Sequence, residues 1–369
     1  MKVLVKHVID KLENLAPIEY SEPYDNVGLI VGNFYQEIEN ILVTLDLTEK
    51  VLLESISKKC NLIISFHPII FYPIKKITGK NSSERIIIKA LKNNISIYVI
   101  HTNLDSVWEG PTCYLSNLLG INREKVLIPK KGMIKKLNAY VPNKYVSKVR
   151  NALFKAGAGN ISNYSKCSYN FDGIGSYMGN DNSNPFHGEK GIFHMEKETC
   201  ICVVFPSHKL DFIKKALLDN HPYEEVAYEI YSIENYSSYL GIGFVGNLIK
   251  KMNIYDFISH VKQKMNLSCI RYSNIINKKK KINRVSMIPG SGSFGIKYAI
   301  QENSDIFISS DLKYHDFFKN EYNITIMDIG HYESEKFTKH LIKFFLENIF
   351  TSIFVYESET ITNPIEYFY

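Results

Sequence analysis

The feature that most constrains this chain is a series of short, continuously apolar runs in its first third. Three of them, at residues 41–45, 62–66 and 95–100, are separated by segments whose apolar residues recur with helical period. Strands that are apolar on both faces are typical of parallel sheets covered by helices, because a parallel connection needs a long crossover. The sequence therefore predicts an α/β core with a largely parallel sheet in residues 1–127.

The middle of the chain has a different texture. Residues 157–191 are rich in Gly, Asn, Ser and Tyr, as turns and an antiparallel excursion would be. Expected strands and helices around this stretch lie at 136–141, 144–156, 199–205, 208–218 and 227–233. We therefore expect a small α+β domain at 128–240, inserted between two halves of the core domain at 1–127 and 241–369. With 369 residues, 45% of them hydrophobic, the chain can bury two such cores.

Composition argues against several classes of protein. The six cysteines form no CxxC pair and are expected to be reduced, and no apolar stretch is long enough to span a membrane. The net charge of +6 is spread widely apart from a lysine run at 278–281. That run lacks the interleaved aromatic residues of a nucleic-acid patch and is expected to be a solvated loop. These features favour a soluble, cytoplasmic protein without a membrane or nucleic-acid partner.

A strand-to-helix junction in the last third carries the first chemical signal. The apolar run 324–329 ends at Gly330, and the residues after it are typical of a helix. His331 and Glu335 are four positions apart, so they would share one face of the first helical turn. An imidazole and a carboxylate so placed form half a metal site. A first-turn Glu that complements the helix dipole beside an ordinary His gives the same pattern.

Other strand ends carry similar groups. His67 and Asp105 directly follow expected strands, and Asp311 follows another, with His315 four residues further on. Ligand sites of parallel sheets lie beyond the carboxyl ends of the strands, where His331 is also expected. Each residue has a structural explanation by itself, such as a hydrogen-bonded His67 or a helix-capping Asp105. A shared site accounts for all of them together.

A glycine-rich turn offers a rival interpretation. Residues 290–295 fit the pattern GxGxxG after an expected strand, and Asp311 follows about twenty residues later, as a dinucleotide fingerprint requires. The turn lies late in the chain, with too little sequence after it for a second mononucleotide-binding half. We therefore favour a tight strand-to-helix turn whose amides could cradle an anion.

Six motifs together resemble the NIF-three-like family, the GTP cyclohydrolase 1 type 2 homologs, over essentially the whole chain. The motifs, in the order of that family, are YDNVGL at 24–29, SFHPIIF at 65–71, HTNLD at 101–105, HPYEEVAY at 221–228, DLKYH at 311–315 and DIGHYESE at 328–335.

The resemblance implies a two-metal site and a ring-shaped homohexamer. Carried over by motif, the metal ligands would be His67, Asp105, His331 and Glu335. Phe66 stands where many family members have the first residue of a His-His pair, so one metal would lose a donor. The cofactor would be one or two divalent ions per chain, and imidazole with carboxylate suits Zn, Fe, Mn or Co.

The resemblance also frames the expected function. A bound ion that activates water would make the protein a metal-dependent hydrolase of a small molecule, either a nucleotide or a cyclic amide. His101 or His315 would orient the ligands or act as general base. The alternative is a metal-binding regulatory or partner-binding protein without turnover. The core would be a three-layer α/β domain, and the inserted domain a ferredoxin-like lid or trimer contact.

Overall fold

The computed structural model describes residues 2–275 and 281–368, and it has a mixed α/β fold. The chain divides into two compact units, one made of the residues up to 129 and from 238 onward, the other of residues 130–237. The expected insertion at 128–240 differs from the second unit by two residues at one end and three at the other. Lys278, Lys279 and Lys280 of the lysine run lie outside the described residues.

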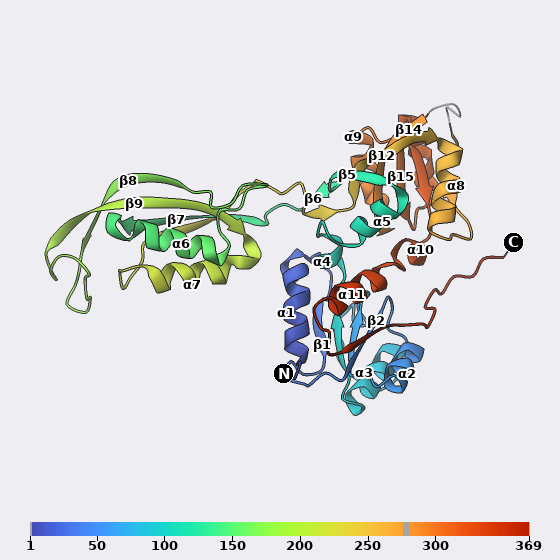
Figure 1. Ribbon diagram of the computed structural model, residues 1–369, viewed down its shortest axis with the longest axis horizontal. Helices are drawn as coiled ribbons and strands as arrows, with labels where there is room; N and C mark the ends of the chain where they lie inside the picture. The colour runs from blue at the N-terminus through green and yellow to red at the C-terminus, as the bar shows by residue number, and fades with distance from the viewer. Residues whose placement is uncertain (1, 276–280, 369) are drawn as a thin grey trace. The chain divides into compact units, whose positions relative to one another are not determined.

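The first sheet of the core unit contains the apolar runs of the first third (Figure 1). Its strands are β1 (Gly28–Val31), β2 (Asn40–Thr44), β3 (Leu62–Ser65), β4 (Ser96–Val99) and β17 (Phe354–Glu357), in the order β1-β4-β3-β2-β17. Strands β17, β2, β3 and β4 are parallel, and β1 is antiparallel at the edge. The expected parallel arrangement therefore holds for the buried strands.

Helices follow the strands of this sheet. They are α1 (Val5–Leu15), α2 (Glu49–Ser57), α3 (Ser82–Lys92), the short α4 (Thr102–Asp105) and α11 (Thr338–Glu347), with a 3-10 turn η1 (Ile18–Tyr20). Side chains of α2 and α3 form one apolar cluster with Leu42, Ile63 and Ile97 of the strands. Because burial of each such side chain contributes about 1.5–3 kcal/mol, this cluster fixes α2 and α3 on one face of the sheet.

The second sheet of the core unit is mixed rather than largely parallel. Its strands are β5 (Ile121–Lys125), β12 (Phe244–Asn253), β13 (Arg271–Tyr272), β14 (Lys281–Ser291), β15 (Ile306–Ser310) and β16 (Thr325–Asp328), in the order β13-β16-β15-β14-β12-β5. The central strands β14, β15 and β16 are parallel, and β5, β12 and β13 pair antiparallel. The pair β6 (Ile128–Pro129) and β11 (Gly241–Ile242) lies where the inserted unit leaves and rejoins the core.

Helices also accompany the second sheet. They are α5 (Pro111–Leu119), α8 (Ile254–Lys264), α9 (Ile296–Gln301) and α10 (His331–Glu335), with 3-10 helices η4 (Ser293–Gly295) and η5 (Tyr314–Tyr322). A 3-10 turn precedes α9, and α10 is a single turn and a half that ends at Glu335. Within the described residues, no helix has the length and apolar character needed to cross a membrane.

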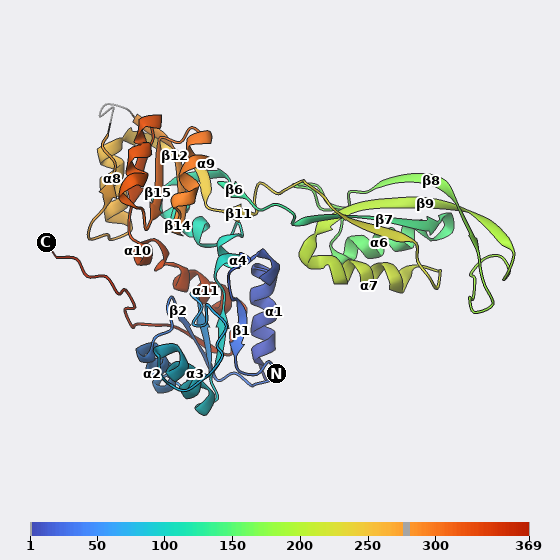
Figure 2. The ribbon, with the colours of Figure 1, turned by 180° about the vertical axis from the view of Figure 1, so that it is seen from behind.

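The inserted unit is a four-stranded antiparallel sheet with two helices on one face (Figure 2). Its elements are β7 (Ile134–Pro142), η2 (Asn143–Tyr145), α6 (Val146–Ala156), β8 (Tyr169–Met178), β9 (Phe193–Pro206), η3 (Ser207–Lys209), α7 (Leu210–Asn220) and β10 (Tyr228–Ser232). The strand order is β10-β7-β9-β8. Alternate residues of β7 and β9, such as Val141 and Ile201, pack under α6 and α7. Their neighbours along each strand face the opposite side of the sheet.

Candidate metal centre

Two parallel strands of the first sheet bring an imidazole and a carboxylate together. Asp46 follows β2 and His67 follows β3, so both side chains leave the sheet at the carboxyl ends of neighbouring strands. The backbone amide of His67 donates to the carbonyl of Leu45, which extends the pairing to the point where the chains diverge. Asp46 Oδ1 lies 2.8 Å from His67 Nδ1, and Asp46 Oδ2 accepts a 2.7 Å hydrogen bond from the hydroxyl of Thr362.

The second sheet supplies a matching pair. Gly330, with φ +87°, turns the chain from β16 into α10, so His331 begins the helix and Glu335 lies one turn further on. Asp311 follows β15 and has a left-handed backbone with φ +56°. Its Oδ2 lies 2.6 Å from His331 Nδ1. Each histidine is therefore held at Nδ1 by an aspartate that ends a neighbouring strand.

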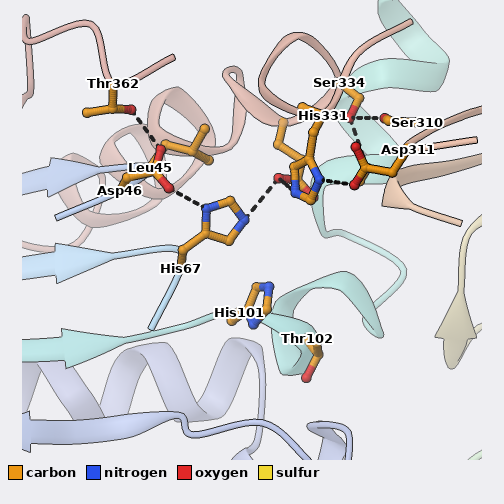
Figure 3. Close-up of polar contacts among 12 residues, drawn as sticks. Leu45, Asp46, His67, His101, Thr102, Ser310, Asp311, His331, Ser334 and Thr362 are labelled. Atoms are coloured by element: carbon orange, nitrogen blue, oxygen red, sulfur yellow. Dashed lines mark hydrogen bonds and ion pairs between the residues drawn. The ribbon is translucent and has the colours of Figure 1, made fainter. Parts of the chain in front are cut away.

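The two pairs meet at one carboxylate. The imidazoles of His67 and His331 approach one another (Figure 3). Glu335 Oε2 lies 3.1 Å from His67 Nε2 and 3.0 Å from His331 Nε2. Ligand atoms of these three residues all lie within 4.8 Å of one another. An aspartate bonded to Nδ1 directs the lone pair of Nε2 outward, which is the usual second shell of a metal-binding histidine. The three residues could therefore hold a metal ion.

The charges of the three residues are strongly coupled. Burial disfavours the charged imidazole of His67, but the Asp46 and Glu335 carboxylates outweigh it and raise its pKa to about 10. The carboxylates of Glu335 and Asp311 raise the pKa of His331 to about 9 against the effect of burial. Burial would raise the pKa of Glu335, but the two imidazoles lower it to about 2. A metal ion at this place would displace the imidazole protons that otherwise neutralise Glu335.

Asp105 lies in the same cavity, beside this cluster. It ends α4, and its Oδ1 atom is buried with no hydrogen-bond partner among the described residues. Burial and the nearby Glu335 raise its pKa well above the ordinary value. A buried carboxylate oxygen without a donor is expensive unless a proton or a cation compensates it. The cavity has a volume of about 460 Å³, and Asp105, His67, His331 and Glu335 all line it.

Comparisons with known proteins identify the family. A family model described as DUF34/NIF3 (NGG1p interacting factor 3) matches residues 3–364. The chain belongs to the DUF34/NIF3 family. It is 34% identical over 98% of both chains to a Bacillus subtilis protein named GTP cyclohydrolase 1 type 2 homolog, and 32% identical to the Halalkalibacterium halodurans protein of the same name, over 97% of this chain and 96% of that one.

Solved structures agree with this assignment. A Bacillus cereus protein described as related to NIF3 superposes with a TM-score of 0.85 at 30% identity, covering 100% of both chains. A Staphylococcus aureus protein superposes with a TM-score of 0.78 at 26% identity, covering 100% of this chain and 99% of that one. The DUF34/NIF3 fold therefore extends over the core and the inserted unit.

His101 lies at the edge of the cluster, with Asp25 beside its Nδ1 atom. Its Nδ1 is 2.9 Å from Asp25 Oδ2, and its ring lies 5.2 Å from that of His67. Burial would raise the pKa of Asp25, but the nearby His101 imidazole and the hydrogen bonds that Thr102 donates lower it to about 2. Phe66 is fully buried and packs edge-on against His101, with ring centres 5.1 Å apart. In this DUF34/NIF3 protein, an apolar ring thus occupies the position before His67.

The other sequence candidates have different surroundings. His315 is exposed on η5, contacts the rings of Tyr314 and Phe318, and is not among the described residues that line the cavity. The turn at 290–295 packs against the candidate site. Gly290 has φ +65°, and a Cβ there would lie 2.2 Å from Glu335 Oε1. That close approach accounts for the first glycine of the GxGxxG pattern without a dinucleotide.

The sequence analysis did not predict the aspartates that lie beside the Nδ1 atoms of the histidines. Asp46 and Asp25 are absent from the predicted site, and Asp311 was expected to pair with His315 rather than His331. Asp46 and Asp311 share one signal, because each follows the last residues of a buried strand. Parallel neighbours end at the same edge of a sheet, so an acid at one strand end is a candidate partner for a histidine at the next.

Proposed function

We propose that this protein is a metal-dependent hydrolase whose ion is held by His67, Asp105, His331 and Glu335. The observation that carries this proposal is the approach of two imidazole Nε2 atoms to one buried carboxylate oxygen, with both Nδ1 atoms bonded to aspartates. Structural histidines do not need this double constraint. The donor set of two nitrogens and carboxylate oxygens suits Zn, Fe, Mn or Co.

The residues fit a divalent cation on electrostatic grounds. Glu335 and Asp105 bring two carboxylates into one buried cluster, and Asp105 has an oxygen without a donor. A divalent ion would compensate both charges at once. When bound, such an ion lowers the pKa of a coordinated water and polarises a carbonyl or phosphoryl oxygen.

His101, which could accept or donate a proton, lies beside the proposed ligands. Because His101 Nδ1 faces Asp25, its Nε2 is the ring atom left to exchange a proton with a molecule in the cavity. The Asp25 carboxylate, whose side chain is buried, fixes the direction of the His101 ring. We therefore assign His101 the role of general base. A role for His315 stays a prediction from the sequence.

The cavity walls favour a small molecule with a flat ring. The volume of about 460 Å³ falls in the range of ligand pockets, which is about 300–1,000 Å³. Tyr24, Phe71 and Phe294 line it, and the first two rings lie 6.2 Å apart. Aromatic side chains stack well on planar heterocycles. A nucleotide or a cyclic amide fits these walls and the hydrolytic chemistry.

Further expectations extend this proposal. The resemblance implies two ions and a ring-shaped homohexamer in the cytoplasm, and Phe66 leaves the second ion with one donor fewer. We propose one firmly held ion per chain and a weaker second site. The three-layer arrangement of the core also stays a proposal. A ferredoxin-like identity of the inserted unit is supported by its element order βαββαβ and its sheet order β10-β7-β9-β8.

The experiment that tests this function measures turnover and metal together. The purified chain is loaded in parallel with Zn²⁺, Mn²⁺, Fe²⁺ or Co²⁺ and incubated with a panel of nucleotides and cyclic amides, with products separated by chromatography and mass spectrometry. We expect one class of substrate to be hydrolysed, and His331→Ala to lower that rate by at least about 100-fold, as loss of a ligand does. His340→Ala, a half-exposed histidine on α11, is the matched control.

Two outcomes contradict the proposal in different ways. Equal background rates for the metal-loaded protein and His331→Ala would remove the hydrolase function. If the protein also binds one ion per chain and loses it in His331→Ala, the site would be a metal centre without turnover, which is the regulatory alternative. Absence of metal binding would remove both.

A further inference from the structure

Carboxylates outnumber the positive charges at the candidate metal centre. Two belong to proposed ligands, and three lie beside the Nδ1 atoms of histidines. The five acids are Asp25, Asp46, Asp105, Asp311 and Glu335. An imidazole that binds a metal ion is neutral. Five negative charges therefore exceed the two positive charges of one divalent ion, and also the four of two ions.

The wall of the cavity adds no positive charge. None of the described residues that line it is a lysine or an arginine. Arg123 Nη1 lies 3.5 Å from the hydroxyl of Thr112, which does line the cavity. The guanidinium of Arg123, however, donates to the carbonyl of Trp108 and stacks on its ring, with Cζ 3.9 Å from the ring centre. A phosphate in the cavity would therefore lack the Arg or Lys side chain that phosphate sites commonly provide.

The glycine-rich turn at 290–295 is a poor substitute for such a side chain. The amide of Gly290 donates to the hydroxyl of Ser334, and the amide of Gly295 donates to the carbonyl of Gly292. The carboxylate of Glu335 also faces this turn, because a Cβ at Gly290 would lie 2.2 Å from Glu335 Oε1. An anion bound at the turn would lie beside a negative charge and would be repelled by it.

The remaining wall suits an uncharged ring. Tyr24 and Phe71 from the first half of the core unit and Phe294 from the second supply aromatic surface. Ser291 and Thr112 add neutral polar groups to the same wall. A hydroxyl can donate to a ring carbonyl or accept from a ring N–H without any charge on the ligand. Aromatic and neutral polar groups together are typical of pockets for small organic molecules.

We propose that the substrate of this site is an uncharged planar heterocycle with a cyclic amide and without a phosphate, of the size of a nucleobase or a nucleoside. This inference rests on the proposed hydrolase function and narrows its substrate class. Hydrolysis consumes one water. Its hydroxyl bonds to the amide carbon, the C–N bond breaks, and its other proton goes to the ring nitrogen. The carboxylic acid so formed loses its proton, and the negative site then repels the carboxylate product.

The test compares probes that differ by one phosphate. Inosine and uridine each contain a cyclic amide, and their 5′-monophosphates add only the charged group. Equilibrium dialysis of the full chain as purified, with its metal counted by elemental analysis, gives the affinities without any need for turnover. We expect wild type to bind at least one nucleoside about tenfold or more tightly than its monophosphate, a difference of about 1.4 kcal/mol.

A lysine placed in the wall should remove this preference. Ser291→Lys adds a cation at an exposed position of the wall, so we expect it to raise the affinity for the monophosphate by about tenfold and to change that for the nucleoside by less than about threefold. Ser57→Lys adds the same charge at an exposed position of α2 that does not line the cavity, and it should change neither affinity. Phe294→Lys, at a half-exposed position of the wall, is the second variant if Ser291→Lys folds poorly.

Three results overturn this proposal. They are equal or tighter binding of the monophosphates by wild type, binding of no probe in either pair, and a monophosphate affinity that neither lysine variant raises. Failure of the proposed function gives a different result. A nucleoside that binds preferentially but is not hydrolysed with any metal removes the hydrolase function and keeps the ligand class. Hydrolysis of nucleotides alone keeps the hydrolase function and removes the ligand class.

Discussion

Two cavities of this protein have similar volumes but opposite constructions. The core cavity, of about 460 Å³, contains the Glu335 carboxylate with the imidazoles of His67 and His331 beside it. The cavity of the inserted unit, of about 510 Å³, has one deeply buried carboxylate among aromatic rings and no described cation in its lining. Both contain an acid that prefers a positive partner. Among the described residues, imidazoles supply part of that partner in the core, whereas no cation lines the cavity of the inserted unit.

The two acids differ in how many hydrogen bonds orient the side chains around them. In the core, Asp46 and Asp311 orient the imidazoles, and Thr362 in turn donates to Asp46. Such outer contacts are what make a metal site specific, because they fix tautomers and ring directions before the ion arrives. The Tyr223 hydroxyl lies beside Glu198 but forms no complete hydrogen bond with a described residue. The side chains around Glu335 are therefore more tightly oriented than those around Glu198.

Removal of the central carboxylate of the core should give the largest effect. Glu335→Ala deletes the oxygen that both Nε2 atoms approach, so we expect the bound metal to fall from about one ion per chain to near zero, at least a 100-fold loss of affinity. Elemental analysis of the purified protein measures it. Glu347→Ala, at an exposed end of α11, should keep full occupancy. Retention of one ion per chain by Glu335→Ala would show that the ligands lie elsewhere.

An added imidazole at position 66 should increase the metal content of the core site. Phe66→His places a nitrogen donor next to His67, whose ring lies 5.2 Å from that of Phe66. We expect metal content to rise from about one ion per chain toward two, with some loss of stability because the position is fully buried. Elemental analysis after dialysis against buffered metal measures this. An unchanged content would mean that residue 66 does not border a second ion.

The aspartates behind the imidazoles should have the next largest effect. Asp46→Asn and Asp311→Asn keep a hydrogen-bond acceptor at Nδ1 but remove its charge, so each should weaken metal binding by about 10–100-fold. Competition with a chromophoric chelator gives the affinities. Asp219→Asn, whose partner Lys215 is exposed like itself, should leave the affinity unchanged. Unaltered metal affinity in both site variants would show that these aspartates do not contribute to metal binding.

The sequence predicted that three of the candidate ligands come together, but not which residues orient them. His67, His331 and Glu335 were predictable because each follows a strongly apolar run, and strand ends of an α/β sheet gather at one edge. Asp46 meets Thr362 across most of the chain, and no local pattern indicates such a pairing. The antiparallel direction of the edge strand β1 likewise depends on its pairing with β4, which is distant in the sequence.

The cavity of the inserted unit had no sequence signal at all. Glu198 lies in an alternating strand where an acid is expected to face solvent. Its burial depends on Gly175 in the partner strand and on the aromatic loop residues that fold over it. Pairing register and loop closure are tertiary properties, so a pattern read along one strand could not indicate them.

The outer support of the core site should also appear in its acid stability. Glu54 of α2 accepts hydrogen bonds from Ser358 and Thr360, in the segment that carries Thr362 to Asp46. Burial would raise the pKa of Glu54, but these donors and Lys58 lower it to about 2 from 4.5. Because the folded-state pKa is depressed, the stabilisation is present above pH 4.5 and is lost as pH falls toward 2.

Glu54→Gln should therefore destabilise the core at neutral pH. We expect a loss of about 1–3 kcal/mol at pH 7, the cost of poorly satisfied buried donors, and convergence with wild type below about pH 3. Denaturant unfolding at a series of pH values measures it. Glu49→Gln, on the same helix but exposed beside Arg85, should leave the free energy of unfolding nearly unchanged. A constant difference between Glu54→Gln and wild type across that pH range would show that the charge of Glu54 is not responsible.

The smallest effect should come from Glu198, and with the opposite sign. Its carboxylate is 8% exposed without a described cation nearby, so the folded protein bears a desolvation cost that an amide in its place would lower. Glu198→Gln should therefore stabilise β9 by about 1 kcal/mol, while metal content of the core stays unchanged. Hydrogen exchange of the β9 amides resolves this local change, which a global melting curve of a two-unit protein would average away. Faster exchange in Glu198→Gln would mean that the carboxylate stabilises the strand, and that the two cavities differ less than their charges suggest.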